Sequence, residues 1–130
     1  MAILRRALLA FAGVWALCGL AIAVVPRWLL VSWFDQVPYP DYTYVRVCGI
    51  AALGSAALAL MISRRLDEVW WWSWAFVIET GLTTLATGLH ALLSGAAGTW
   101  FWWLFAVTNG ALTAGLLLGI ARAGVEKPIV

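Results

Sequence analysis

Four long apolar runs constrain the fold of this chain more than any other feature of its sequence. They cover roughly residues 7–25, 42–62, 69–93 and 100–121. A transmembrane helix needs ~20 such residues to cross ~30 Å of hydrocarbon, and each run supplies them. Hydrophobic residues make up 65% of the chain and charged residues 11%, whereas soluble domains average about 45–50% and about 25%. The sequence therefore predicts one all-α integral membrane domain over residues 1–130.

The connections between the runs predict how the helices are arranged. Spans two and three are joined by SRRLDE, and spans three and four by SGAAGT. Connections this short force neighbouring helices to run antiparallel, so we expect an up-down four-helix bundle. The first span follows Arg5 and Arg6 as a signal peptide would, but its apolar run exceeds the usual ~7–15 residues. We therefore expect it to be retained as a transmembrane helix.

The basic residues are distributed unevenly between the two sides of the predicted bundle. Because cytoplasmic loops carry an excess of arginine and lysine, the richer side predicts the cytoplasmic face. That side holds both termini, and chain length and arginine distribution favour a bacterial inner membrane. The cytoplasmic set is Arg5, Arg6, Arg64, Arg65, Arg122 and Lys127, and the other side has Arg27 and Arg46 beside Asp35 and Asp41.

The longest connection, PRWLLVSWFDQVPYPDY at residues 26–42, is too apolar for an ordinary loop. We expect it to contain a short interfacial helix that lies flat on the outer leaflet. Pro38 and Pro40 would then turn the chain back into span two. The alternative interpretations are a cap over the mouth of the bundle and a docking surface for a partner.

Tryptophans and small residues predict how the helices meet lipid and each other. Ten tryptophans are present, and nine lie near predicted span ends, where indole rings anchor at the headgroup level. Trp70, Trp71 and Trp72 point in three directions around a helix, so we expect at least one to pack on a neighbouring helix or subunit. Small residues at four-residue spacing in spans two and four favour close packing. Cys18 and Cys48 form no CxxC pair and are interpreted as packing residues.

Polar side chains inside spans two, three and four form the candidate site. Glu79 lies about ten residues into span three, and Asn109 lies nine residues into span four from the opposite side. The two residues are therefore predicted at similar depth, near the midplane, on adjacent antiparallel helices. A shared helical face continues outward from Glu79, and Arg46 on span two is expected at the depth of its outer end. The predicted polar seam consists of Glu79, Asn109, Arg46, His90, Thr83 and Thr87.

A carboxyl group at the centre of a bilayer is costly, so we expect Glu79 to face the bundle or a partner rather than lipid. The hypothesis is that its carboxylate accepts hydrogen bonds from Asn109 and Thr83, and through water from Arg46. The seam could be a site for a ligand or proton, or a polar lock that fixes helix register. Thr80 and Thr84 are expected to bond backbone carbonyls one turn back.

Several kinds of chemistry find no support in the residues. His90 is the single histidine, so haem ligation by two histidines of this chain is excluded. No cluster has metal-ligand spacing, and no nucleophile elbow, P-loop or dinucleotide fingerprint occurs, so we predict no metal, no catalytic residues and no cofactor of the chain itself. No basic tract points to nucleic acid. A pocket for bound lipid or quinone stays open, because it needs mainly apolar walls and a few polar groups.

Spans two and three carry a resemblance to a known family. Span two reads VRVCGIAALGSAALAL, with Arg46 one turn in, and span three has the central Glu79 and the outer His90. Over most of its length the chain resembles the DoxX-like group of small four-helix bacterial membrane proteins. Some members are subunits of quinone-linked oxidoreductase assemblies, and the resemblance draws attention to Arg46 and Glu79. The charged end of the second helix found in many members is represented here only by Ser63, Arg64 and Arg65.

Two functional hypotheses follow from these observations. The first is a small non-enzymatic membrane subunit or accessory protein of a larger complex, with quinone-linked redox assemblies as a candidate. Its partners would be the lipid bilayer and other membrane subunits or a second copy of the chain. The alternative is a small carrier or binding protein for a lipophilic ligand or a proton, in which the midplane Glu79 is central.

Overall fold

The computed structural model describes residues 1–94 and 99–126, and this part of the chain is helical without strands. Four helical stretches within it are long and apolar enough to cross a membrane, as predicted. The elements in chain order are α1 (Ala2–Val24), the π-helix η1 (Trp28–Trp33), α2 (Thr43–Arg64), α3 (Leu66–Val69), the 3-10 helix η2 (Trp70–Ser73), α4 (Trp74–Leu93) and α5 (Thr99–Glu126).

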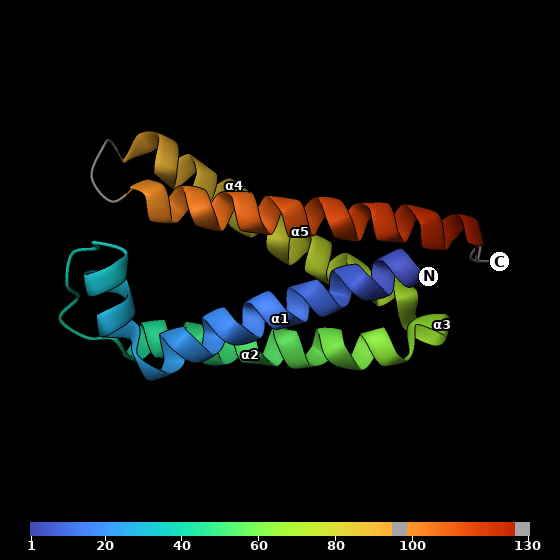
Figure 1. Cartoon of the computed structure of the whole chain (residues 1–130), viewed down its shortest axis with the longest axis horizontal. Coiled ribbons are helices and arrows are strands. Elements are labelled where there is room, and N and C mark those ends of the chain that lie inside the picture. Colours follow the sequence, from blue (N-terminus) through green and yellow to red (C-terminus); the bar gives the residue numbers. More distant parts are fainter. Residues whose placement is uncertain (95–98, 127–130) are drawn as a thin grey trace.

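The long helices form two hairpins, α1 with α2 and α4 with α5, as Figure 1 shows. The hairpins meet mainly through α1 and α5. The N-terminus and the end of α5 at Glu126 lie together at one end of the molecule beside α3, and η1 lies at the opposite end (Figure 1). We refer to these as the terminal end and the η1 end. Within each hairpin the two helices pack closely against each other. The candidate site described below lies between the hairpins.

Two glycines allow the backbones of α1 and α2 to touch. A methyl group built on Gly49 would lie 2.7 Å from the backbone oxygen of Gly19 and 2.7 Å from the backbone nitrogen of Ala23. At the terminal end of the same pair, the Arg5 Nε donates to the backbone oxygen of Ser63 at 3.2 Å. Position 19 therefore faces 49 and position 5 faces 63, which is the pairing expected of antiparallel helices. Small residues permit this close approach.

The seam between α1 and α5 widens from the terminal end toward the η1 end. A methyl group on Gly119 would lie 2.7 Å from the Cα of Leu4, so the backbones are in contact there. At Gly115 the nearest atom to such a methyl is the Cβ of Ala7, at 3.8 Å. Further along, the long side chain of Trp15 is needed to reach Asn109. The contact between α1 and α5 thus changes from backbone contact at Gly119 to a hydrogen bond from a long indole at Asn109, and the two hairpins lie further apart toward the η1 end.

The third span is not one continuous α-helix, because α3 and the 3-10 turn η2 precede α4. Trp70 is buried, and its ring lies 3.7 Å from the position of a methyl built on Gly124 of α5. Trp71 and Trp72 stack on each other with ring centroids 4.7 Å apart and remain about half exposed. The prediction that at least one of these tryptophans packs on a neighbouring helix is confirmed, by Trp70.

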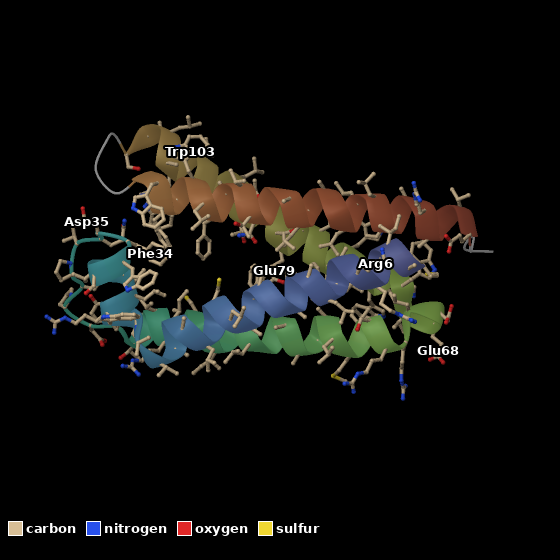
Figure 2. The ribbon with its side chains drawn as sticks, viewed as in Figure 1. Arg6, Phe34, Asp35, Glu68, Glu79 and Trp103 are labelled. Carbon is tan, nitrogen blue, oxygen red and sulfur yellow. The ribbon has the colours of Figure 1, made fainter. Side chains whose placement is uncertain are left out.

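The predicted short helix in residues 26–42 is present as η1, and the chain turns sharply after it. Asp35 adopts a positive φ of 51°, a conformation that few residues other than glycine take up. Just before it, the Phe34 ring packs against Phe101 of α5 at 4.2 Å and Trp100 at 5.1 Å. The loop that follows α1 therefore reaches across to the other hairpin, and Figure 2 shows Phe34 between the two.

The helices extend beyond the predicted apolar boundaries at several ends. The first begins at Ala2 instead of residue 7, and the fourth ends at Glu126 instead of residue 121. Hydropathy marks only the part of a helix that suits hydrocarbon, whereas the backbone hydrogen bonds continue through charged residues at the membrane surface. The second helix agrees with its prediction to within two residues at each end.

Candidate functional site

Glu79 joins the two hairpins through a hydrogen bond to α2. Its carboxylate Oε1 accepts from the Ser55 hydroxyl at 2.8 Å, and the side chain is half-buried. Figure 2 shows Glu79 midway along the molecule, between the terminal end with Arg6 and the η1 end with Phe34. The prediction that Glu79 faces protein is confirmed. The predicted direct donors, Asn109 and Thr83, are wrong, because Ser55 donates to the carboxylate and those two side chains donate to backbone oxygens.

Asn109 forms a second polar link between the hairpins, and its partner is Trp15. Its Oδ1 accepts from the Trp15 indole N–H at 3.3 Å, and its Nδ2 donates to the backbone oxygen of Phe105 at 3.0 Å. Asn109 is only 3% exposed. The prediction that Glu79 and Asn109 lie opposite each other is wrong, because α4 and α5 pair Thr80 with Thr113 and Thr84 with Gly110. Residue counts from the span ends give neither the register of two helices nor the direction in which a side chain points.

The threonine hydroxyls of α4 donate to backbone oxygens of their own helix. Thr83 Oγ1 donates to the backbone oxygen of Glu79 at 2.7 Å, not to its carboxylate, and Thr87 Oγ1 donates to Thr83 in the same way at 2.7 Å. Thr80 and Thr84 also bond carbonyls one turn back, as predicted. In addition, Thr80 and Thr113 hydroxyls lie 2.8 Å apart and connect α4 to α5. The threonine face therefore strengthens the hairpin and offers few free donors.

Arg46 and His90, the predicted outer end of the seam, have separate partners. Arg46 Nη1 donates to the backbone oxygen of Ala23 at the end of α1, at 3.2 Å. The His90 ring packs edge-on against Trp102 of α5, with centroids 4.5 Å apart. The six predicted residues thus have three kinds of contact. Glu79 and Asn109 link the two hairpins, Thr83 and Thr87 bond their own helix, and Arg46 and His90 each contact the other helix of their own hairpin.

A partly enclosed cavity of about 320 Å³ lies between the hairpins, on the η1 side of the Trp15–Asn109 bond. Trp15 and Asn109 line the end nearer the middle of the molecule, which we call the floor, and Phe34 lines the η1 end. Phe11 supports the floor, because its ring stacks on Trp15 with centroids 5.0 Å apart and packs at a tilt against Phe76 at 4.9 Å. The walls are almost entirely apolar. The remaining lining residues are Val14, Cys18, Gly19, Ile22, Cys48, Ala52, Leu104, Phe105 and Thr108.

Trp15 and Ser55 are the site residues that sequence reasoning missed, and both had a signal. Trp15 is the tryptophan that does not lie near a predicted span end, so an anchoring role could not explain it. Ser55 is a hydroxyl in the middle of span two, where a hydroxyl needs a partner. Cys18 and Cys48, interpreted as packing residues, are free thiols that line the cavity from different helices.

The chemistry of this arrangement is binding by shape and hydrogen bonding. Apolar walls with one amide at the floor suit a lipophilic molecule that carries a single polar group. No three His, Cys, Asp or Glu side chains gather closely enough to hold a metal ion in the part of the chain that the structure describes. The chain matches no protein-family model, no curated protein and no solved structure.

Proposed function

We propose that this chain is a bacterial inner-membrane protein that binds a lipophilic ligand between its two hairpins. The four apolar helices cross the bilayer in an up-down arrangement with both termini in the cytoplasm. The support for this orientation is that Met1 and Glu126 lie together at one end of the molecule, with Arg64 and Arg65 at the end of α2. At the other end, η1 lies at the surface of the outer leaflet.

The observation that carries the proposed function is the apolar cavity with Trp15 and Asn109 at its floor. Its volume of about 320 Å³ falls at the lower end of the ~300–1,000 Å³ of small-molecule sites. The Asn109 amide has two N–H donors, and the bond to Phe105 uses one of them. A ligand carbonyl at the floor could accept from the other. An isoprenoid quinone or a fatty acyl derivative has this combination of an apolar body and a carbonyl.

Glu79 acts in this proposal as a lock between hairpins and not as part of the ligand site. The cavity lining does not include it, and its carboxylate bonds Ser55 on the other hairpin. Interhelical hydrogen bonds contribute about 0.6 kcal/mol on average in one membrane protein. The Ser55–Glu79 and Trp15–Asn109 bonds both link the hairpins and together fix the distance between them. The cavity occupies the space that remains between the hairpins.

The test compares two alanines that are adjacent on α2. Ala52 lines the cavity, whereas Ala51 is exposed and does not. We expect Ala52→Phe to reduce binding of decylubiquinone and of oleate by at least about tenfold, because the ring fills the cavity. Ala51→Phe should leave binding unchanged. Quenching of tryptophan fluorescence in detergent measures decylubiquinone binding, and Trp15→Phe identifies the contribution of the floor.

If neither probe binds the folded protein, or if both alanine variants bind as wild type does, the cavity is not a ligand site. Folding of each variant is checked by circular dichroism and size-exclusion chromatography. A reduction with Ala51→Phe as large as that with Ala52→Phe would assign binding to the outer surface of α2.

A second candidate function, an accessory subunit of a membrane complex, is favoured by the exposed tryptophans at the terminal end. Trp71, Trp72 and Trp74 are each about half exposed and crowd one short segment. Purification in mild detergent with mass analysis tests it. Stable co-purification of another membrane protein that is lost in Trp71→Ala/Trp72→Ala supports the hypothesis, and a lone chain in the wild type contradicts it.

A further inference from the structure

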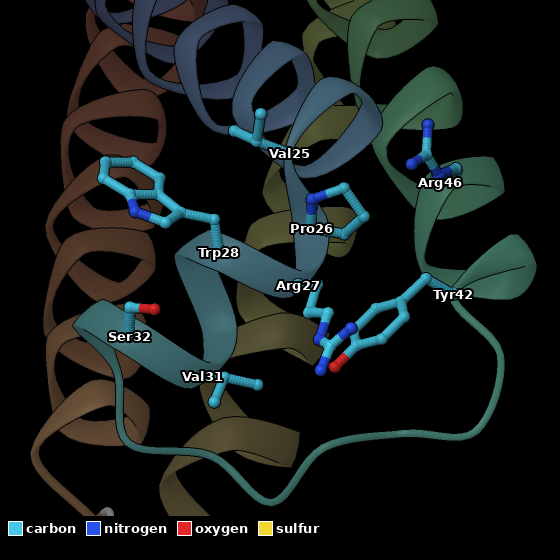
Figure 3. A pocket seen from close by; sticks show the side chains of 8 residues that line it. All are labelled: Val25, Pro26, Arg27, Trp28, Val31, Ser32, Tyr42 and Arg46. Atoms are coloured by element: carbon cyan, nitrogen blue, oxygen red, sulfur yellow. The ribbon is translucent and has the colours of Figure 1, made fainter.

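A second hollow lies at the η1 end, outside the cavity described above. Its volume is about 590 Å³, and it is open to the surface. Figure 3 shows that η1 forms one side and the beginning of α2 the other, with Arg27, Tyr42 and Arg46 around the same space. The remaining lining residues are Val25, Pro26, Trp28, Val31 and Ser32.

The polar groups around the hollow are hydrogen-bond donors with a net positive charge. Arg46 is held in place because its Nη1 donates to the carbonyl of Ala23, close to the C-terminal end of α1. A guanidinium has five N–H donors, so most of those of Arg46 stay available. Among the residues that the structure describes, neither Arg27 nor Arg46 forms an ion pair. Two guanidinium groups therefore line this hollow, and no carboxylate is among its lining residues.

Tyr42 adds a donor to the hollow, and the neighbouring acid Asp41 is not among the lining residues. The Tyr42 phenolic oxygen accepts from the backbone N–H of Tyr39 at 3.2 Å, which leaves its own O–H as a donor. The carboxylate of Asp41 accepts from the hydroxyl of Thr43 at 2.8 Å and from the Thr43 backbone N–H at 3.0 Å. Asp41, the acid nearest in sequence to the lining residue Tyr42, thus bonds the first residue of α2.

We propose that this hollow binds the phosphate group of an anionic membrane lipid. The planar guanidinium group of arginine matches the geometry of phosphate oxygens, and the O–H of Tyr42 adds a third donor group. The hollow lies where α1 ends and α2 begins, so in a spanning protein it meets the headgroups, and Trp28 provides an amphipathic ring at that level. The apolar residues Val25 and Val31 would contact the start of the acyl chains. This site is independent of the proposed lipophilic-ligand cavity.

The experiment measures lipid retained by the purified full chain in mild detergent, using native mass spectrometry. Phosphatidylglycerol and phosphatidylcholine with identical acyl chains are the probes. We expect selective retention of phosphatidylglycerol, reduced about fivefold by Arg27→Gln or Arg46→Gln and about twenty-fivefold by both, since each basic residue near a membrane surface contributes a factor of about five. Tyr42→Phe, which removes one hydroxyl, should reduce retention by a smaller factor.

Arg65→Gln is the matched control, because Arg65 is an exposed arginine at the terminal end of α2. An equal loss with Arg65→Gln would overturn the proposal, since net charge alone would then explain retention. Equal retention of both lipids by the wild type would overturn it as well. Binding of inorganic phosphate alone, with the same dependence on Arg27 and Arg46, would assign the hollow to a soluble anion and not to lipid. If an arginine variant fails to fold, Tyr42→Phe still decides.

Discussion

At the residue scale, Ser55 and Trp15 each use one donor to join two hairpins across an apolar interior. Ser55 donates to Glu79 and Trp15 donates to Asn109. In hydrocarbon an unpartnered polar group costs several kcal/mol, so both acceptors depend on these donors to stay buried. Ser55, which would be an ordinary small residue in a soluble helix, therefore helps to determine how the hairpins dock.

Replacing Ser55 with alanine tests the link to Glu79. We expect Ser55→Ala to lower the free energy of unfolding by about 1–2 kcal/mol, because the half-buried carboxylate loses its donor. Glu79→Gln should have a smaller effect, since the amide oxygen still accepts from Ser55. Unfolding in a series of dodecyl sulfate mixtures measures both. A larger loss with Glu79→Gln than with Ser55→Ala would show that the Glu79 carboxyl group stabilises the fold through an interaction other than the bond from Ser55.

Asp41 gives a pH-dependent prediction outside the membrane. Hydrogen bonds from the Thr43 hydroxyl and then from its backbone N–H hold the pKa of Asp41 below its ordinary value of 3.8. A lowered pKa means that the folded state prefers the ionised form, so this contribution is present above the ordinary value and is lost as pH falls through the folded-state pKa. We expect the Thr43 amide resonance in a protein labelled with ¹⁵N-threonine to titrate with a midpoint below 3.8.

Asp41→Asn is the control for that titration, because asparagine keeps an acceptor for Thr43 without an ionisable group. The Thr43 resonance should then be independent of pH over the same range. A midpoint at or above 3.8 in the wild type would contradict the prediction.

At the scale of the elements, the crossing of α1 and α2 depends on two glycines. We expect Gly49→Ala to lower the free energy of unfolding by about 1–3 kcal/mol, because its methyl would lie 2.7 Å from backbone atoms of α1 that cannot move aside. Gly54 on the same helix has nothing within 4 Å of such a methyl. Gly54→Ala should therefore be neutral or slightly stabilising. Equal losses for the two variants would mean that helix propensity, and not contact, explains the effect.

Much of the element-level structure could be predicted because hydropathy and length determine where membrane helices lie. The helix in residues 26–42 was predictable too, since an apolar loop with Trp28 and Trp33 needs an interface. The 3-10 turn at Trp70 was not, because it depends on how that ring fits against Gly124 of another helix. Counting residues from the span ends placed Asn109 opposite Glu79, whereas the contacts between α4 and α5 put Gly110 beside Thr84. The count also did not show that Asn109 faces α1.

At the scale of the whole molecule, Phe34 connects the hairpins at the η1 end and closes the cavity. We expect Phe34→Ala to open it, since the ring contacts with Phe101 and Trp100 of α5 would be lost. The measurement is the rate of maleimide labelling at the cavity thiol of Cys18 in a Cys48→Ala background, which should rise several-fold. Trp33→Ala is the matched control, because the Trp33 ring is exposed and contacts Trp28 of the same loop. Equal rates in the two variants would show that Phe34 does not control access.

In the proposed membrane-spanning arrangement, the widening seam between α1 and α5 also has a consequence for the surrounding bilayer. Backbone contact at Gly119 and an interposed indole at Asn109 make the molecule narrower at the terminal end than at the η1 end. Such a wedge displaces more lipid from one leaflet than from the other, and bilayer deformation around a protein carries an energetic cost. Lateral pressure in the leaflet at the wide end therefore acts to push the hairpins together. Membrane curvature and lipid shape become variables that set the width of the cavity.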